Sequence, residues 1–187
     1  MGADVLKIMT VCSHNRTRSV MSMAMLQAGF DRRLGPGRAA VRSLGFGPEG
    51  IPAIPDAVDA MQRRGFDVSD HRSRQVTAKR VEAADLILTS EKDHVIKIAS
   101  ASPVAYRRTF TLPEFCDHIS SDPLAEGRSL AAWMTDLSEG RRAGDYLRSD
   151  IPEVADPTGS PRRQFEAATV GIEEMCATVV DVISRSF

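Results

Sequence analysis

A cysteine, an arginine and a serine lie close together near the start of the chain, in the segment CSHNRTRS. Cys12 follows an apolar run, and Arg18 and Ser19 come after a loop of five residues. A planar guanidinium can bind two oxygens of a phosphate, and nearby cations and amide dipoles favour the reactive thiolate form of a thiol. The spacing C-x5-R-S therefore predicts an anion-binding loop with a nucleophile at its base.

This loop joins a predicted strand to a predicted helix. Val5–Val11 is an apolar run of strand length, and Ser19–Phe30 is a helical pattern that is apolar on most sides. In open parallel sheets, ligands bind outside the carboxyl ends of the strands, where loop amides and helix N-termini face an anion. The predicted phosphate-binding residues are Ser13, His14, Asn15, Arg16, Thr17, Arg18 and Ser19.

Strands and helices alternate along the rest of the chain. The further predicted strands are Ala39–Phe46, Asp85–Ser90 and Tyr106–Leu112, and the further predicted helices are Pro55–Gly65, Lys92–Ala99 and one that includes Phe165–Val182. This alternation is typical of βαβ units and predicts a parallel sheet covered on both faces. Residues 120–150 are less regular and include a helix-like stretch, Leu130–Gly144.

The composition limits the class of protein. A chain of 187 residues is long enough for one α/β domain and too short for two ordinary ones. The 24 Lys and Arg nearly balance the 25 Asp and Glu, so we expect neither a nucleic acid nor a membrane as partner. Three widely spaced cysteines exclude a disulfide framework and favour a reducing compartment. No apolar run is long enough to span a membrane, and Lys7 interrupts the first, so we expect a cytoplasmic protein without a signal peptide.

The segment that begins at Cys12 resembles the phosphate-binding loop of the low-molecular-weight protein tyrosine phosphatase family, C-x-G-N-x-C-R-S. Three later stretches resemble the same family in order: VRSLGFG, then GFDVSDHRSRQVT followed by ADLILTSEKDH, and VADPTG just before the last helix. The resemblance implies a three-layer α/β fold, flavodoxin-like or phosphotyrosine phosphatase I-like, with a central, mainly four-stranded parallel sheet flanked by helices. The resemblance runs in order through most of the chain apart from residues around 120–150, and we expect residues 1–187 to form a single domain with an added segment there.

The resemblance also implies a cysteine-dependent phosphomonoesterase of the protein-tyrosine-phosphatase type, with no cofactor and no metal. The Cys12 thiolate attacks phosphorus and forms a phosphocysteine, while Arg18 and the loop amides bind the equatorial oxygens. Asp156, in VADPTG, protonates the leaving oxygen and then activates the water that hydrolyses the intermediate. Asp122 also precedes a proline and is the alternative acid. Inorganic phosphate and vanadate are the expected inhibitors.

Four further residues have supporting roles in this reading. Ser19 donates a hydrogen bond to the thiolate, and Asn15, which tolerates a left-handed backbone, holds the shape of the loop. Ser43 and His71 are the expected structural support behind Asn15. No residue in this set, and none elsewhere in the chain, is needed as a metal ligand, because amides and a guanidinium neutralise the bound anion.

Three positions depart from the family pattern. His14 stands where the family has glycine, so its imidazole is expected at the mouth of the site. Thr17 replaces the second cysteine of the loop, and Thr158 stands where many members have an aromatic residue. We expect the wall that stacks on a phosphotyrosine ring to be thinner here, or to come from the region of Tyr146 or Trp133.

Three other functions compete with a protein tyrosine phosphatase. The first is a phosphatase of the same mechanism that acts on a small phosphorylated molecule instead of a phosphotyrosine protein. The second is a thiol redox enzyme similar to arsenate reductases, which requires Cys116 and Cys176 to relay a disulfide from Cys12. The third is an inactive phosphate-binding module, an alternative raised by His14 in the loop.

Overall fold

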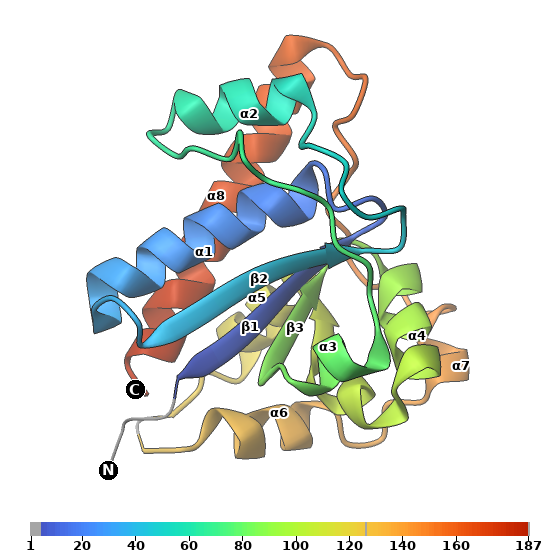
Figure 1. Ribbon diagram of the computed structural model, residues 1–187. Coiled ribbons are helices and arrows are strands. Elements are labelled where there is room, and N and C mark those ends of the chain that lie inside the picture. The colour runs from blue at the N-terminus through green and yellow to red at the C-terminus, as the bar shows by residue number, and fades with distance from the viewer. Residues whose placement is uncertain (1–4, 126, 187) are drawn as a thin grey trace.

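A four-stranded parallel sheet forms the centre of the computed structural model, which describes residues 5–125 and 127–186 (Figure 1). The strands lie in the order β2-β1-β3-β4 and are β1 (Leu6–Cys12), β2 (Ala39–Gly45), β3 (Leu86–Thr89) and β4 (Thr109–Thr111). The register of the long pair runs from Leu6 opposite Ala39 to Cys12 opposite Gly45. Because all four strands are parallel, Cys12 lies at the edge where their carboxyl ends meet.

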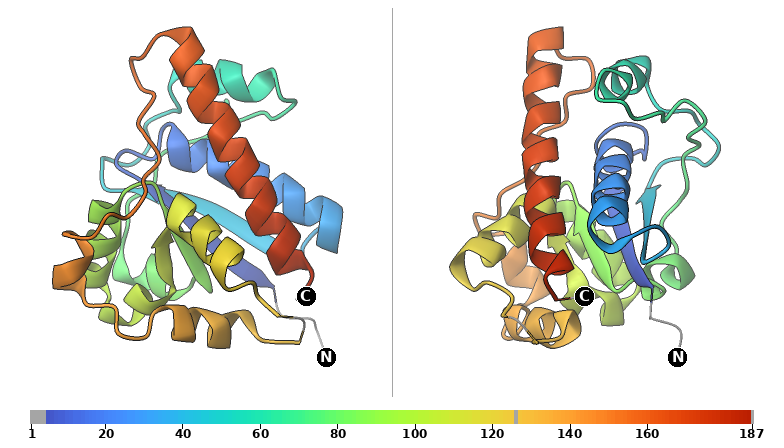
Figure 2. Two further views of the ribbon diagram at one scale, coloured as in Figure 1. Left: turned by 180° about the vertical axis from the view of Figure 1, so that it is seen from behind. Right: turned by 90° about the vertical axis from the view of Figure 1, so that its left-hand side faces the viewer.

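One face of the sheet is covered by three helices, and Figure 2 shows two of them, α8 and α5, in front of the sheet when the molecule is seen from behind. The three are α1 (Arg18–Leu34), α5 (Leu112–Ser121) and α8 (Arg162–Ser184). Helices α1 and α8 pack closely at Gly29, where a Cβ atom would lie 2.7 Å from Cγ2 of Val180. The larger apolar core fills the space between these helices and the sheet.

The opposite face is covered by α3 (Ala78–Glu82), α4 (Lys92–Ala101) and the 3₁₀ helix η1 (Pro103–Arg108). A smaller apolar cluster lies beneath them, with Val11, Ile87 and Ile98 among its members. Helix α2 (Pro55–Gln62) packs against α8. The predicted three-layer fold, with a parallel sheet flanked by helices, is thus confirmed.

Two short helices, α6 (Leu130–Leu137) and α7 (Ala143–Tyr146), lie in the irregular segment before α8. Arg141, between them, holds this segment against the sheet. Its guanidinium lies 4.6–4.9 Å from the ring centres of Tyr106, Phe110 and Tyr146, and it pairs with Glu114 at 3.4 Å. A guanidinium stacked on aromatic rings and paired with a carboxylate is a stable way to place a cation at a half-buried position.

The main error in the predicted elements concerns residues 106–112. They were expected to form one strand, but β4 has only three residues, because Pro103 starts the 3₁₀ helix η1 and Leu112 already belongs to α5. Thr111 caps α5 together with Glu114 in a reciprocal capping box, which ends the strand. Within the described residues, no helix is both long and apolar enough to cross a membrane.

Candidate active site

The loop from Cys12 to Ser19 connects β1 to α1 and contains the predicted nucleophile. The Cys12 side chain is buried, and its Sγ lies 3.1 Å from Oγ of Ser19. The Asn15 side-chain amide donates a hydrogen bond to the same Oγ at 3.0 Å. Since that oxygen already accepts from Asn15, the Ser19 hydroxyl hydrogen is free to be donated to sulfur. This arrangement stabilises negative charge on Cys12.

Asn15 sets the shape of the loop from a left-handed backbone conformation, with a φ of 55°. Its Oδ1 accepts a hydrogen bond from the Arg74 amide at 2.8 Å, and its carbonyl accepts one from His71 Nε2 at 2.8 Å. Burial lowers the pKa of His71, against the opposing effect of that hydrogen bond. Gly45 lies so close that a Cβ there would be 2.6 Å from the Asn15 nitrogen, so glycine is required.

Arg18 is 2% exposed and is held by groups from two distant parts of the chain. Its Nη1 donates to the carbonyl of Val154 at 2.8 Å, and the Val154 amide in turn donates to Ser90 at the end of β3. Its Nη2 lies 2.6 Å from Oε1 of Glu91 and 3.0 Å from Oδ2 of Asp156. The guanidinium that is expected to bind phosphate is therefore paired with two carboxylates.

Asp156 lies beside Arg18, whereas Asp122 ends α5 and pairs with Arg128 in the irregular segment. Partial burial acts to raise the pKa of Asp156, but hydrogen bonds from Thr158 and the charge of Arg18 outweigh it and lower the pKa below its usual value. The hydroxyls of Thr158 and Thr17 lie 3.2 Å apart. This contact joins the loop that carries Asp156 to the loop from Cys12 to Ser19.

Glu91 and His94 belong to the site, although sequence reasoning did not place them there. His94 is buried, and its Nε2 lies 3.1 Å from Ser13 Oγ and 3.7 Å from Glu91 Oε2. Burial lowers the pKa of His94 to about 4, so its imidazole is neutral at neutral pH. Both residues follow β3 at the carboxyl edge of the sheet, and this position after a strand is the signal that could have identified them.

A pocket of about 140 Å³ lies over the loop. Its lining contains Cys12, His14, Arg16, Thr17, Arg18, Ile54, Asp156 and Thr158. The three predicted catalytic side chains thus surround one space. His14 is exposed at the rim, and Arg16 donates from Nε to the carbonyl of Pro52 at 2.8 Å.

Three residues expected near the site lie elsewhere. Ser43 is buried in the sheet opposite Thr10, and its hydroxyl has no hydrogen-bond partner among the described residues, so it does not support Asn15 directly. Trp133 is fully buried against Phe115, and Tyr146 is buried in the Arg141 cluster. The expectation that either aromatic residue forms a wall of the site is therefore wrong: Trp133 packs on Phe115 of α5, and Tyr146 packs on Tyr106 of η1.

The two remaining cysteines lie on helices that pack together. The Cys116 thiol on α5 contacts the carbonyl of Met175 on α8 at 3.6 Å, beside Cys176, a proximity that their sequence separation did not predict. Burial raises the pKa of Cys116 to about 12 and also raises the pKa of Cys176. Both thiols are therefore protonated at neutral pH and are poor nucleophiles, which weakens the redox alternative.

Comparison with known proteins agrees with this geometry. A family model described as Low molecular weight phosphotyrosine protein phosphatase matches residues 7–130. Probable low molecular weight protein-tyrosine-phosphatase EpsP of Ralstonia nicotianae is 37% identical over 117 residues, which cover 62% of this chain and 77% of that protein. A protein-arginine-phosphatase of Geobacillus stearothermophilus is 32% identical over 117 residues, covering 62% and 75%. The crystal structure of a YwlE mutant from Bacillus subtilis has a TM-score of 0.72 at 23% identity, covering 95% of this chain and 98% of that one.

The fold and the relatives together define a cysteine-based phosphatase. The chain belongs to the low molecular weight phosphotyrosine protein phosphatase family. The matched region contains the whole loop from Cys12 to Ser19 and ends before the segment that carries Asp156.

Proposed function

We propose that this phosphatase hydrolyses phosphomonoesters through a phosphocysteine on Cys12, with Asp156 as general acid and base. The observation that carries the proposal is that Cys12 and Arg18, from the loop between β1 and α1, and Asp156, from the segment before α8, line one pocket of about 140 Å³. A thiolate, a guanidinium and a carboxylic acid around one small space are the groups that displacement at a phosphate requires.

In the first step, the Cys12 sulfur attacks phosphorus and the ester oxygen leaves. Arg18 turns from its two carboxylate partners to the phosphate oxygens, and the amides of residues 13–18 supply further donors. The Ser19 hydroxyl, 3.1 Å from Sγ, stabilises the thiolate before attack and again when sulfur is the leaving group in the second step. The supporting bonds from Asn15 to Ser19 and from His71 to Asn15 keep this hydroxyl in place.

Asp156 transfers the proton in both steps. In the unliganded site its pKa is lowered, partly by Arg18, so the carboxyl is ionised at neutral pH. A bound phosphate dianion draws the Arg18 charge to itself and repels a second anion, and both effects raise the pKa of Asp156. Substrate binding therefore favours the protonated form that can donate to the leaving oxygen.

The proposed substrate is a phosphotyrosine protein, with a small phosphorylated molecule as the alternative. Ile54 and Thr158 supply a short wall beside the rim residues His14 and Arg16, and a phenyl ring that carries the phosphate can rest between them. We place the enzyme in the cytoplasm, where a reducing environment keeps Cys12 in its reduced form.

The packing of Arg141 supports a single domain across residues 1–187. Phosphate and vanadate are the proposed inhibitors.

The test is hydrolysis of p-nitrophenyl phosphate by the parent enzyme, by Cys12→Ser and by Cys116→Ser. We expect the parent to be active in the presence of EDTA, Cys116→Ser to keep that activity, and Cys12→Ser to lose turnover while still binding vanadate. Turnover by Cys12→Ser near the parent level would refute the phosphocysteine. Peptides that carry phosphotyrosine or phosphoarginine then distinguish the substrate, and a preference for phosphoarginine would overturn the tyrosine assignment.

A further inference from the structure

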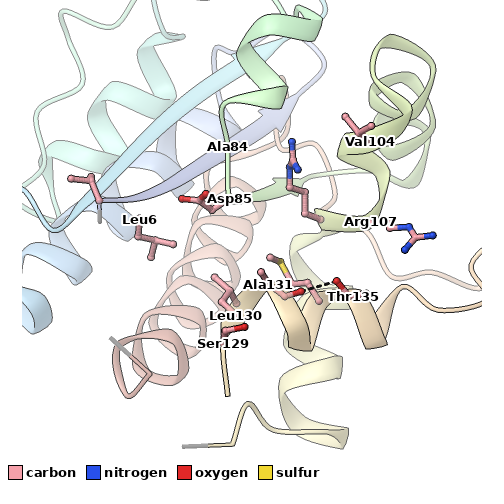
Figure 3. A pocket seen from close by; sticks show the side chains of 12 residues that line it. Leu6, Ala84, Asp85, Val104, Arg107, Ser129, Leu130, Ala131 and Thr135 are labelled. Carbon is pink, nitrogen blue, oxygen red and sulfur yellow. Dashed lines mark hydrogen bonds between the residues drawn. The ribbon is translucent and has the colours of Figure 1, made fainter. Parts of the chain in front are cut away.

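A second cavity lies at the opposite end of the sheet from Cys12, beside the amino ends of β1 and β3. Its volume is about 510 Å³, against about 140 Å³ for the catalytic pocket. Figure 3 shows the side chains around it, which come from the start of β1, the turn before β3, η1 and α6. Cavities of a few hundred cubic ångströms are the size that holds small organic ligands.

The apolar part of this cavity is aliphatic. Leu6, Ala84, Leu130 and Met134 line it, and among residues 5–125 and 127–186 no aromatic side chain does so. Val104, at its border, is 65% exposed, which is unusual for a large apolar residue. A surface of this kind favours a flexible alkyl chain, which gains free energy mainly by leaving water.

Two arginines supply an unneutralised positive charge at the same cavity. Neither Arg107 nor Arg108 forms a salt bridge with any residue in the described parts of the chain. Arg108 donates one hydrogen bond, to the carbonyl of Glu82 at 3.1 Å, and its Nε is buried without a partner. Asp85 also lines the cavity, but its carboxylate accepts a hydrogen bond from the Lys7 amide at 2.8 Å. The charged side chains that line the cavity are thus two guanidinium groups and one carboxylate, which already accepts a hydrogen bond. Their net charge is positive and suits an anionic head group.

Apart from Leu130, the wall formed by α6 lies beyond the residues that the family model matches. The family match ends at residue 130, and α6 occupies Leu130–Leu137. Three residues of that helix besides Leu130 line the cavity, namely Ala131, Met134 and Thr135, and Ala131 is exposed. The cavity thus combines residues inside the matched region, among them Arg107 and Arg108, with a wall from α6 that lies beyond it.

We propose that this cavity binds a medium-chain aliphatic carboxylate, with the alkyl chain between β1 and α6 and the carboxylate at Arg107 and Arg108. Aliphatic walls select the chain over an aromatic ring, and the guanidinium fork matches the two oxygens of a carboxylate. The site lies at the beginning of the strand that ends in Cys12, at the far edge of the sheet from the catalytic pocket.

The first test is a titration of the whole protein with decanoate, in which calorimetry measures the binding. Ala131→Phe fills the cavity from an exposed helix position, and Ala132→Phe adds the same ring to a neighbouring exposed position that does not line the cavity. We expect saturable binding by the parent and by Ala132→Phe, and at least a tenfold loss in Ala131→Phe. Circular dichroism and melting temperature establish that both variants are folded. Absence of saturable binding by the parent, or equal binding by the two variants, would overturn the proposal.

The second test concerns the head group. Arg107→Gln/Arg108→Gln should weaken decanoate binding about tenfold and leave binding of the uncharged decanol almost unchanged. The matched control is Arg162→Gln/Arg163→Gln, an exposed pair at the start of α8, which should change neither affinity. If decanol binds the parent as tightly as decanoate, or if both arginine pairs have the same effect, recognition of the carboxylate is refuted.

Discussion

His94 makes the stability of the protein depend on pH in a way that can be calculated. Its side chain is 2% exposed, stacked on Phe46 and close to Ser13. Burial lowers its pKa to about 4, the positive charges of Arg18 and Lys97 act in the same direction, and Glu91 and Asp93 oppose them. Replacing His94 by Gln keeps a neutral polar group near Ser13 and removes the titration.

The sign and size of the effect follow from linkage. In the unfolded chain, histidine takes up its proton near pH 6.5, whereas folded His94 does so only near pH 4. Between these values the unfolded state binds more protons, so the free energy of unfolding falls as the pH decreases. The contribution of neutral His94 to the free energy of unfolding is fully present above pH 6.5. About 2 kcal/mol of this contribution is lost between pH 7 and pH 5.

The assay is urea unfolding of the parent and of His94→Gln at several pH values from 7.5 to 4.5. We expect the parent to lose about 2 kcal/mol more than the variant between pH 7 and pH 5. The comparison variant is His118→Gln, which removes a histidine on α5, outside the site. Parallel curves for the parent and His94→Gln would show that His94 is not held neutral by burial.

Three further predictions concern the reaction. Arg18→Lys should lower kcat/KM by about 10²-fold or more, because an ammonium cannot bind two phosphate oxygens in one plane; steady-state rates within threefold of the parent would place Arg18 outside the site. Asp156→Asn should slow hydrolysis by about 10²-fold, with a larger deficit on alkyl phosphates than on p-nitrophenyl phosphate, while Asp122→Asn stays near the parent; reversed results would move the acid to Asp122. Thr17→Val should lose the hydroxyl contact with Thr158, reduce kcat about fivefold and shift the limb of the pH–rate profile that belongs to the acid. Thr17→Ser should keep the contact and the parent's profile. Identical pH–rate profiles for the two variants would refute a role for the Thr17–Thr158 contact in placing the acid.

The sequence was informative where chemistry and local pattern coincide. The spacing from Cys12 to Ser19 predicted a loop between a strand and a helix, and β1 and α1 have those positions. The DP pair at Asp156 was placed by family resemblance, and the structure brings it to Arg18. Local reasoning was enough here because, in a parallel sheet, every loop that follows a strand lies at the edge where the carboxyl ends of the strands meet.

Other features depend on contacts that no local pattern shows. The burial of Trp133 and Tyr146 arises because the segment before α8 folds back onto α5 and η1, which the irregular composition of that segment did not indicate. Likewise, Glu91 reaches Arg18 only because β3 lies next to β1 in the sheet. Glu91 was therefore missed because no local pattern shows which strands are neighbours, and the roles expected of Trp133 and Tyr146 were wrong because the path of the irregular segment could not be predicted.

The pairing of Arg18 with Asp156 joins residues 138 positions apart. As the chain emerges from the ribosome, the thiol loop is complete long before the acid-bearing loop has been synthesised. Under the proposed mechanism, an unfinished chain, or one cut in the loop that leads to α8, carries Cys12 and Arg18 but lacks the proposed general acid, Asp156. Under this proposal, such a fragment retains the loop without full catalysis, so activity reports that synthesis has passed Asp156 and that folding has brought this residue to Arg18.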